Sequence, residues 1–158
     1  MRMYSGVFTV FLGIIFPAAL SASDIFMCRA EHSTGFTINA DGKTWKSTNF
    51  IADDTYLIKP TSEVIEILGS EVAYAYEITE FGNEYPTYSC NDGFTYTYLD
   101  TTLPSSSLKC SGVGQFYFSK DTFRYIVTYP FGWIDSKASE IQKEGNTPHI
   151  ELGSCVKM

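Results

Sequence analysis

The sequence is poor in the residues that catalysis and metal binding most often use. It has two histidines, His32 and His149, and contains neither a CxxC nor an HExxH motif. It also lacks a glycine-rich phosphate loop and a serine in a nucleophile-elbow pattern. These absences argue against the familiar zinc, nucleotide and serine-hydrolase chemistries. We therefore expect no metal, no cofactor and no enzymatic activity.

Basic residues are also scarce. The chain has 11 lysines and arginines against 18 acidic residues, which gives a net charge of −7 at pH 7. This balance argues against nucleic acid as a partner, because phosphate contacts need clustered basic side chains. Polybasic attraction to an anionic membrane is disfavoured for the same reason.

One long apolar run is present, and it lies at the N-terminus. Arg2 supplies a positive start, Val7–Leu20 supplies an apolar stretch of the expected length, and small residues follow. The pattern predicts a secretory signal peptide over residues 1–22 and a single domain over residues 23–158. A retained membrane anchor is the alternative, but no later segment is long and apolar enough to span a bilayer, so we expect no stable membrane insertion after cleavage.

All four cysteines lie beyond this leader, at Cys28, Cys90, Cys110 and Cys155. In an exported chain without clustered histidine, such cysteines indicate disulfides rather than zinc ligands. Four cysteines allow three connectivities, and spacing alone does not choose among them. The leader and the cysteines together predict a periplasmic or secreted bacterial protein with two disulfides.

The clearest hairpin signal has its turn at Lys120–Asp121. Aromatic and polar residues alternate on both sides of this turn. A two-residue loop there places Phe118 opposite Phe123 and Phe116 opposite Tyr125. All four rings would then lie on one face of the hairpin.

Other segments carry strand signals too. Two more hairpins are predicted, with turns at Asp41–Gly42, placing Ile38 opposite Trp45, and at Gly69–Ser70, placing Ile65 opposite Tyr74. A last strand over residues 149–156 has Ile150 and Leu152 on one face and Glu151 on the other. Short strands at regular spacing predict an all-β fold, a small antiparallel barrel or sandwich of about eight to ten strands built mainly of hairpins.

Helix has little support in this sequence. Ser136–Glu144 could form one short helix, but it has almost no apolar face, so a loop is the alternative. The cluster of threonine, proline and serine over Thr101–Ser107 is expected to be a connection between strands.

An internal similarity favours a closed barrel over a sandwich. The segment after Cys28 and the segment after Cys110 both read cysteine, glycine, a hydrophobic pair, a turn with aspartate, and an aromatic followed by a base. If the similarity is a true repeat, it favours pairing Cys28 with Cys155 and Cys90 with Cys110. Convergent hairpin chemistry is the other interpretation.

The run from Cys110 to Arg124 and the ending from Thr147 to Cys155 resemble a group of short exported alphaproteobacterial proteins that have no assigned activity. The resemblance implies a periplasmic setting and no particular chemistry. In size, cysteine use and β content the chain more remotely resembles the periplasmic inhibitors of c-type lysozyme. Their motif Ser-Gly-x-x-Tyr begins here at Ser111 and lacks its tyrosine, which puts that inhibition in doubt.

Few residues suggest chemistry. His32 beside Glu31, and His149 near Glu151, could each form a base with an orienting carboxylate, and a hydrolase would need one pair to converge in a cleft. The simpler interpretation is polar residues at the surface or at strand edges. The adjacent acids Asp53–Asp54 are expected to be solvated in a loop.

Aromatic residues are in surplus, at 16% of the chain. The segment with Tyr129, Phe131 and Trp133 stands out, because its proline and glycine predict a turn while three large rings would be costly to leave in water. A plug that closes one barrel end is the favoured interpretation, and a binding surface is the alternative.

The favoured function is a non-catalytic binding module for an apolar or sugar-like ligand or for a partner protein. A structural or stress-related envelope protein is the alternative, and a hydrolase is third.

Overall fold

Alternating apolar and polar residues form β-strands throughout the computed structural model, which describes residues 24–39, 41, 43–62, 64–67, 70–131 and 147–158. In chain order the strands are β1 (Phe26–Ile38), β2 (Trp45–Phe50), β3 (Thr55–Pro60), β4 (Val64–Ile67), β5 (Ser70–Ala73), β6 (Tyr76–Glu80), β7 (Tyr88–Cys90), β8 (Thr95–Tyr98), β9 (Thr101–Pro104), β10 (Ser107–Gly112), β11 (Gln115–Ser119), β12 (Arg124–Tyr129) and β13 (His149–Lys157). Within these ranges there is no helix that could cross a bilayer.

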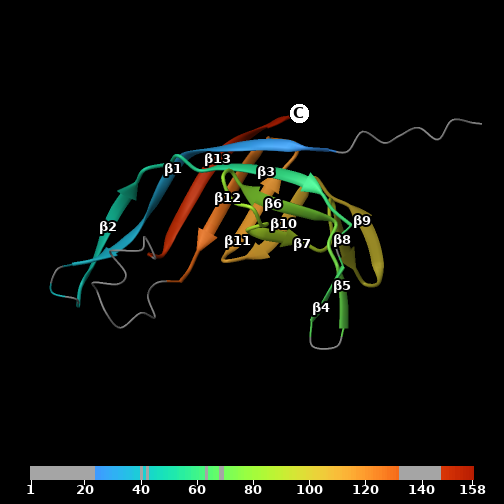
Figure 1. Ribbon diagram of the computed structural model, residues 1–158, viewed down its shortest axis with the longest axis horizontal. Coiled ribbons are helices and arrows are strands. Elements are labelled where there is room, and N and C mark those ends of the chain that lie inside the picture. Colours follow the sequence, from blue (N-terminus) through green and yellow to red (C-terminus); the bar gives the residue numbers. More distant parts are fainter. Residues whose placement is uncertain (1–23, 40, 42, 63, 68–69, 132–146) are drawn as a thin grey trace, which may run out of the picture.

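Eight of the strands close into an antiparallel barrel (Figure 1). The order is β1, β3, β6, β7, β10, β11, β12 and β13, and β13 pairs with β1 to complete the ring. The prediction of an all-β antiparallel barrel is confirmed, and the sandwich alternative is wrong. Closure leaves no free sheet edge around the ring itself.

The long strand β1 carries the sheet beyond the barrel. Its first residues, Phe26 to Arg29, pair with β3, and its last, Ser33 to Ile38, pair with β2. A bulge at Glu31 separates the two parts, which is where an extra residue bends a strand. β2 and the end of β1 therefore project from one side of the barrel (Figure 1).

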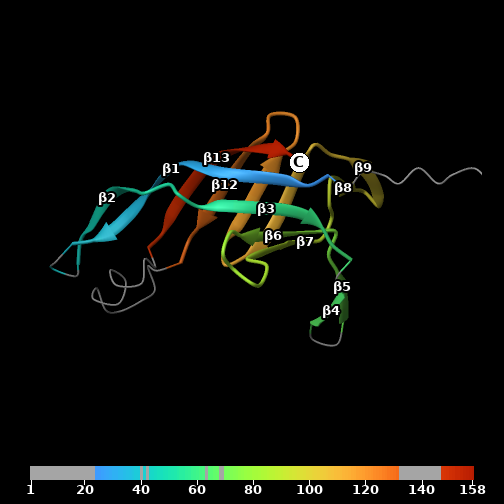
Figure 2. The ribbon, with the colours of Figure 1, turned by 45° about the horizontal axis from the view of Figure 1, so that its top comes forward.

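Two hairpins lie outside the ring, β4–β5 and β8–β9, each a separate two-stranded sheet (Figure 2). The segment Thr101–Ser107 was predicted to be a connection between strands, but its first part, Thr101–Pro104, forms strand β9. Leu99 and Asp100 both have positive φ, 44° and 62°, and make a two-residue turn that directs Thr101 back against Tyr98.

The barrel interior is filled by side chains from the inward faces of the strands. The buried core consists of Phe26, Tyr56, Ile58, Ile78, Tyr88, Leu108, Phe116, Phe118, Tyr125 and Val127, with all four cysteines. Phe116 and Tyr125 stack with ring centroids 5.0 Å apart, and Phe26 packs on Phe118 at 4.7 Å. Such a barrel is a packed core rather than a hollow calyx.

The disulfides are Cys28–Cys155 and Cys90–Cys110, the pairs that the internal similarity favoured. The similarity itself is not a structural repeat. Cys28 and Gly35 share the single strand β1, whereas Cys110 lies in β10 and Gly114 follows the end of that strand. Each bridge instead joins facing residues of neighbouring strands, across the β1–β13 and β7–β10 pairings.

One of the three predicted hairpin registers is confirmed and two are wrong. Ile38 faces Trp45 as predicted. In the β11–β12 hairpin, however, Phe118 faces Tyr125 and Phe116 faces Val127, two residues away from the prediction. The cause is a longer loop, in which Phe123 adopts a φ of 55°.

Phe123 accordingly leaves the strand face and packs near Phe26, at a centroid distance of 6.2 Å. The β4–β5 hairpin shows a similar shift, since Ile65 faces Val72 rather than Tyr74. The predicted leader over residues 1–22 and the segment Ser136–Glu144 lie outside the described residues.

Candidate functional site

The predicted aromatic surface lies where β12 ends. Tyr129 stacks on the imidazole of His149, with centroids 5.2 Å apart and 24° between the planes. Phe131 packs edge-on against Tyr129 at 5.6 Å and is 46% exposed. The structure brings these two predicted residues together, while Trp133 lies outside the described residues.

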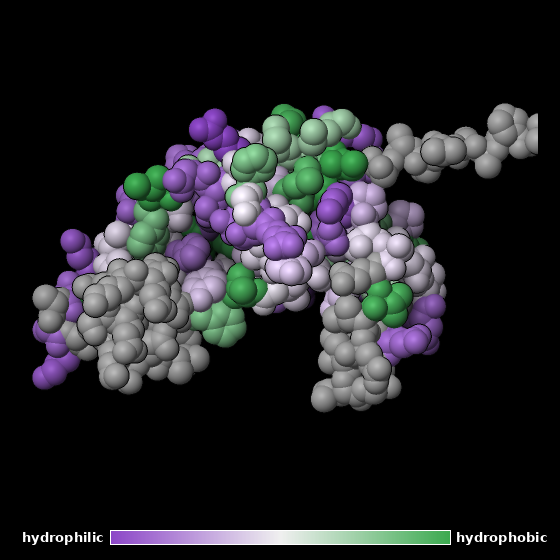
Figure 3. Space-filling model, in the orientation of Figure 1, coloured by the Kyte–Doolittle hydropathy of each residue, from purple (hydrophilic) through white to green (hydrophobic). Residues whose placement is uncertain are grey.

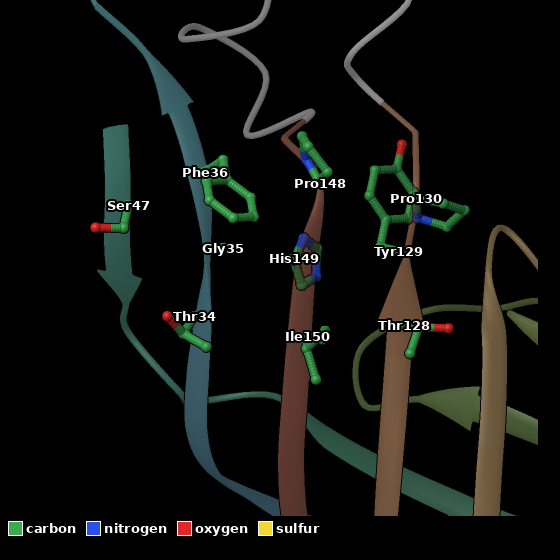
Figure 4. Close-up of a pocket in the computed structure, with 10 residues that line it drawn as sticks. All are labelled: Thr34, Gly35, Phe36, Ser47, Thr128, Tyr129, Pro130, Pro148, His149 and Ile150. Carbon is green, nitrogen blue, oxygen red and sulfur yellow. The ribbon is translucent and has the colours of Figure 1, made fainter. Parts of the chain in front are cut away.

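An open groove of about 450 Å³ runs beside Tyr129 (Figure 4). Its walls are almost wholly apolar. The lining residues are Thr34, Gly35 and Phe36 of β1, Ser47 of β2, Thr128 and Tyr129 of β12, Pro130, Pro148, and His149 and Ile150 of β13. Sequence reasoning singled out two of them, Tyr129 as part of a possible binding surface and His149 as a possible base.

The floor of the groove is a row of cross-strand neighbours. Ile150 of β13 faces Thr128 on one side and Thr34 on the other. Ile150 is 44% exposed and Phe36 is 51% exposed, so both side chains offer apolar surface to solvent. Exposed apolar side chains that lie together mark candidate binding surfaces more often than single ones do.

Gly35 lets β1 approach the start of β13 closely beside the groove. A Cβ at this position would lie 2.2 Å from the carbonyl oxygen of Pro148, so a side chain here would collide with backbone. The next amide, of Phe36, donates to the same oxygen at 3.0 Å. This close approach ties β1 to the start of β13, although the two segments are far apart in sequence.

The two histidines do not form the predicted base and carboxylate pairs. His149 Nδ1 lies 2.8 Å from the carbonyl oxygen of Thr147, and its ring is held between Tyr129 and Phe50. His32 is exposed on β1, and the carboxylate of its neighbour Glu31 accepts a hydrogen bond from Ser154. Across the described ranges, neither histidine is hydrogen-bonded to a carboxylate.

Glu151 points into the barrel, which sequence reasoning missed. It is only 2% exposed, and its carboxylate accepts a hydrogen bond from the Tyr125 hydroxyl at 2.9 Å. Asp54 and Tyr56 also interact with it. Asp53 and Asp54 lie in the loop before β3, as predicted, and Asp53 is exposed, but Asp54 is half-buried beside Glu151. Ile150 and Leu152, the apolar neighbours of Glu151, face outward instead.

This environment changes the acid chemistry of the cluster. Burial, followed by the hydrogen bond and charge of Asp54, raises the pKa of Glu151 to about 7. Burial, followed by the charge of Glu151, raises the pKa of Tyr56, Tyr88 and Tyr125 well above the ordinary tyrosine value. The tyrosines therefore stay protonated, and two of them donate hydrogen bonds to acids, Tyr125 to Glu151 and Tyr56 to Asp54.

Other site chemistry is absent from the part of the chain that is described. All four cysteines are in disulfides, and no group of three or more histidine, cysteine, aspartate or glutamate side chains there could hold a metal ion. Two disulfides are compatible with an oxidising extracellular or periplasmic location.

Comparison with known protein families, with curated proteins and with solved structures gives no match to this chain.

Proposed function

We propose that the protein is an exported, non-catalytic binding module that takes an apolar ligand in the groove between β1, β12 and β13. The observation that carries this proposal is the groove itself, an open hollow of about 450 Å³ with almost no polar wall. Ligand sites of this size are commonly apolar with a few polar groups that orient the ligand. Here the polar group at hand is the His149 imidazole, whereas the Thr34 hydroxyl donates to the carbonyl oxygen of Thr48 at 3.2 Å and the Thr128 hydroxyl points away from the groove (Figure 4).

The filled barrel interior supports the proposal that the ligand binds on the outside of the barrel. Phe116, Tyr125, Phe26 and Phe118 occupy the space that a lipocalin-like barrel would leave to its ligand. An internal ligand would have to displace stacked rings, and opening a packed aromatic core costs several kcal/mol. The external groove needs no such rearrangement.

The predicted leader and the two disulfides support the proposal that the protein is exported. A signal peptide over residues 1–22 would direct the chain across the inner membrane of a bacterium into the periplasm. The four cysteines could be oxidised in that compartment. Without the leader, whose only charged residue is Arg2, the chain has 10 basic and 18 acidic residues, and a net charge of −8 favours solubility.

The groove can be tested with a neutral apolar probe, N-phenyl-1-naphthylamine, whose fluorescence rises on burial. We expect Ile150→Ser to weaken probe binding about fivefold or more, because it removes the apolar centre of the groove floor. Leu152→Ser is the matched control, since Leu152 lies on the same face of β13 with nearly the same exposure and does not line the groove.

Equal effects of the two substitutions, or no binding of the probe to the wild-type protein, would contradict the proposal. The second outcome would favour the structural envelope role, which a filled barrel also allows.

A further inference from the structure

A second hollow, of about 430 Å³, lies on the outer face of β7 and β10. Ser89 of β7 and Ser111 of β10 face each other across its floor, and Lys109 follows on β10. The turn with Asn91 and Asp92 bounds it on one side. It shares no lining residue with the apolar groove, so its role does not depend on the function proposed above.

The floor of this hollow is held in place by a disulfide. Cys90 lies between Ser89 and Asn91, and Cys110 lies between Lys109 and Ser111, so the bridge fixes both strands directly beneath the lining residues. A ligand would therefore meet a preformed floor and would not have to order it, which lowers the cost of binding.

One wall is the β8 strand, which carries Tyr96. The amide of Ser105 donates to the carbonyl oxygen of Phe94 at 2.8 Å, closing the base of the β8–β9 hairpin. Phe94 itself packs against Tyr76 and Phe118 of the barrel. The hairpin is thereby anchored two residues before Tyr96, whose ring is 49% exposed beside the hollow.

The polar groups of the hollow are available to a ligand. Within the described residues the Ser89 hydroxyl, the Asn91 amide and the Asp92 carboxylate have no hydrogen-bond partner. Together they present donors and acceptors at several points of one concave surface. The apolar groove, by contrast, offers almost none.

The formal charges of the residues that line the hollow sum to zero, because Asp92 and Lys109 carry one charge each. The Lys109 ammonium also lies 5.9 Å from the centroid of the Tyr117 ring. An ion of either sign would meet a like charge there. A ligand with many hydroxyl groups and no net charge would satisfy both residues through hydrogen bonds, and charged partners make such bonds the strongest.

We propose that this hollow binds a neutral saccharide. The Tyr96 ring packs against the C–H face of a sugar ring, and Asp92 and Asn91 hydrogen-bond to adjacent sugar hydroxyls. The Ser89 hydroxyl completes the floor. An aromatic platform beside planar amide and carboxylate groups suits the alternation of apolar faces and hydroxyl edges on a pyranose.

The proposal can be tested by NMR titration of the disulfide-bonded protein with N,N′-diacetylchitobiose and with maltotriose, using digalacturonic acid as an anionic comparison. We expect at least one neutral sugar to shift the amide signals of Ser89, Asp92 and Tyr96. Tyr96→Ala should weaken that binding about tenfold, and Tyr96→Phe should largely preserve it, because the ring remains.

Tyr98→Ala is the matched control, since Tyr98 is two residues along the same strand, is 64% exposed and does not line the hollow. It should leave the affinity unchanged within about twofold. Three results would overturn the proposal: no shift with either neutral sugar at millimolar concentration, a preference for digalacturonic acid, or an equal loss in the Tyr96→Ala and Tyr98→Ala variants. Unchanged amide signals in the barrel core would verify that each variant is folded.

Discussion

Glu151 lies inside the barrel, with the Tyr125 hydroxyl hydrogen-bonded to its carboxylate and with Asp54 and Tyr56 beside it. A buried carboxylate without a cation is costly, and proteins reduce that cost by protonating the group. The raised pKa of Glu151, about 7, means that the native state holds this proton over a pH range in which the unfolded chain has lost it.

This proton makes stability depend on pH. Between about pH 4.5 and 7 the native state binds more protons than the unfolded state, so the free energy of unfolding falls as pH rises through that window. We expect a loss of about 2 kcal/mol between pH 5 and pH 8 in urea denaturation. Glu151→Gln should remove most of this slope, because an amide mimics the protonated acid.

Glu84→Gln is the control for that experiment, since Glu84 is exposed, and it should keep the slope of the wild-type protein. A wild-type stability that rises between pH 5 and pH 8 would show that Glu151 is not the dominant titrating group.

The orientation of Glu151 also shows what the sequence could not tell. Alternation along residues 149–156 predicts two faces correctly, but it does not say which face is inside. Hydropathy alone favours Ile150 and Leu152 as the inner face, and the structure has the reverse. The inner position of Glu151 depends on Tyr56 and Tyr125, which come from other strands and satisfy its carboxyl group.

At the scale of elements, turn conformation separates the correct registers from the wrong ones. Asp41 and Gly42 suit a tight turn, and the predicted pairing of Ile38 with Trp45 is confirmed. The β11–β12 register failed because Phe123 takes a positive φ that few bulky residues adopt. Its ring instead packs near Phe26, a tertiary contact that local sequence does not encode.

The β7–β10 pairing is the shortest of the barrel, with two facing residue pairs. The Cys90–Cys110 bridge reinforces it, whereas Cys28–Cys155 lies within a β1–β13 ladder of nine pairs. The two bridges should therefore stabilise the fold in different ways. Cys90–Cys110 should hold the short β7–β10 pairing closed, and Cys28–Cys155 should act mainly by restricting the unfolded chain.

Replacing each cysteine pair by alanine tests this difference. The loops closed by the bridges span 127 and 20 residues, so chain entropy predicts losses of about 5 kcal/mol for Cys28–Cys155 and about 3 kcal/mol for Cys90–Cys110. Native-state hydrogen exchange should nevertheless show faster local opening at Ser89 and Ser111 only in the Cys90–Cys110 variant. If hydrogen exchange were equally faster at all amides in both variants, the β7–β10 pairing would not open independently of the rest of the barrel.

At the scale of the whole molecule, closure of the barrel creates the candidate site. Phe36 and Ile150 are far apart in sequence and become neighbours because β1 pairs with β13. Sequence reasoning identified Tyr129 from its aromatic turn, but it had no signal for partners that meet through barrel closure. The all-β class followed from local alternation, whereas the groove depends on long-range pairing.

In the function that we propose, the ligand binds on the outside of a filled barrel. The most direct test is an NMR titration of the disulfide-bonded protein with N-phenyl-1-naphthylamine, following backbone amides across the molecule. We expect the largest shifts at Phe36, Tyr129 and Ile150, with the signals of Leu108 and Ile78 in the core unchanged. Large shifts at Leu108 and Ile78 with a silent groove would contradict the account, because they would place the ligand inside the barrel.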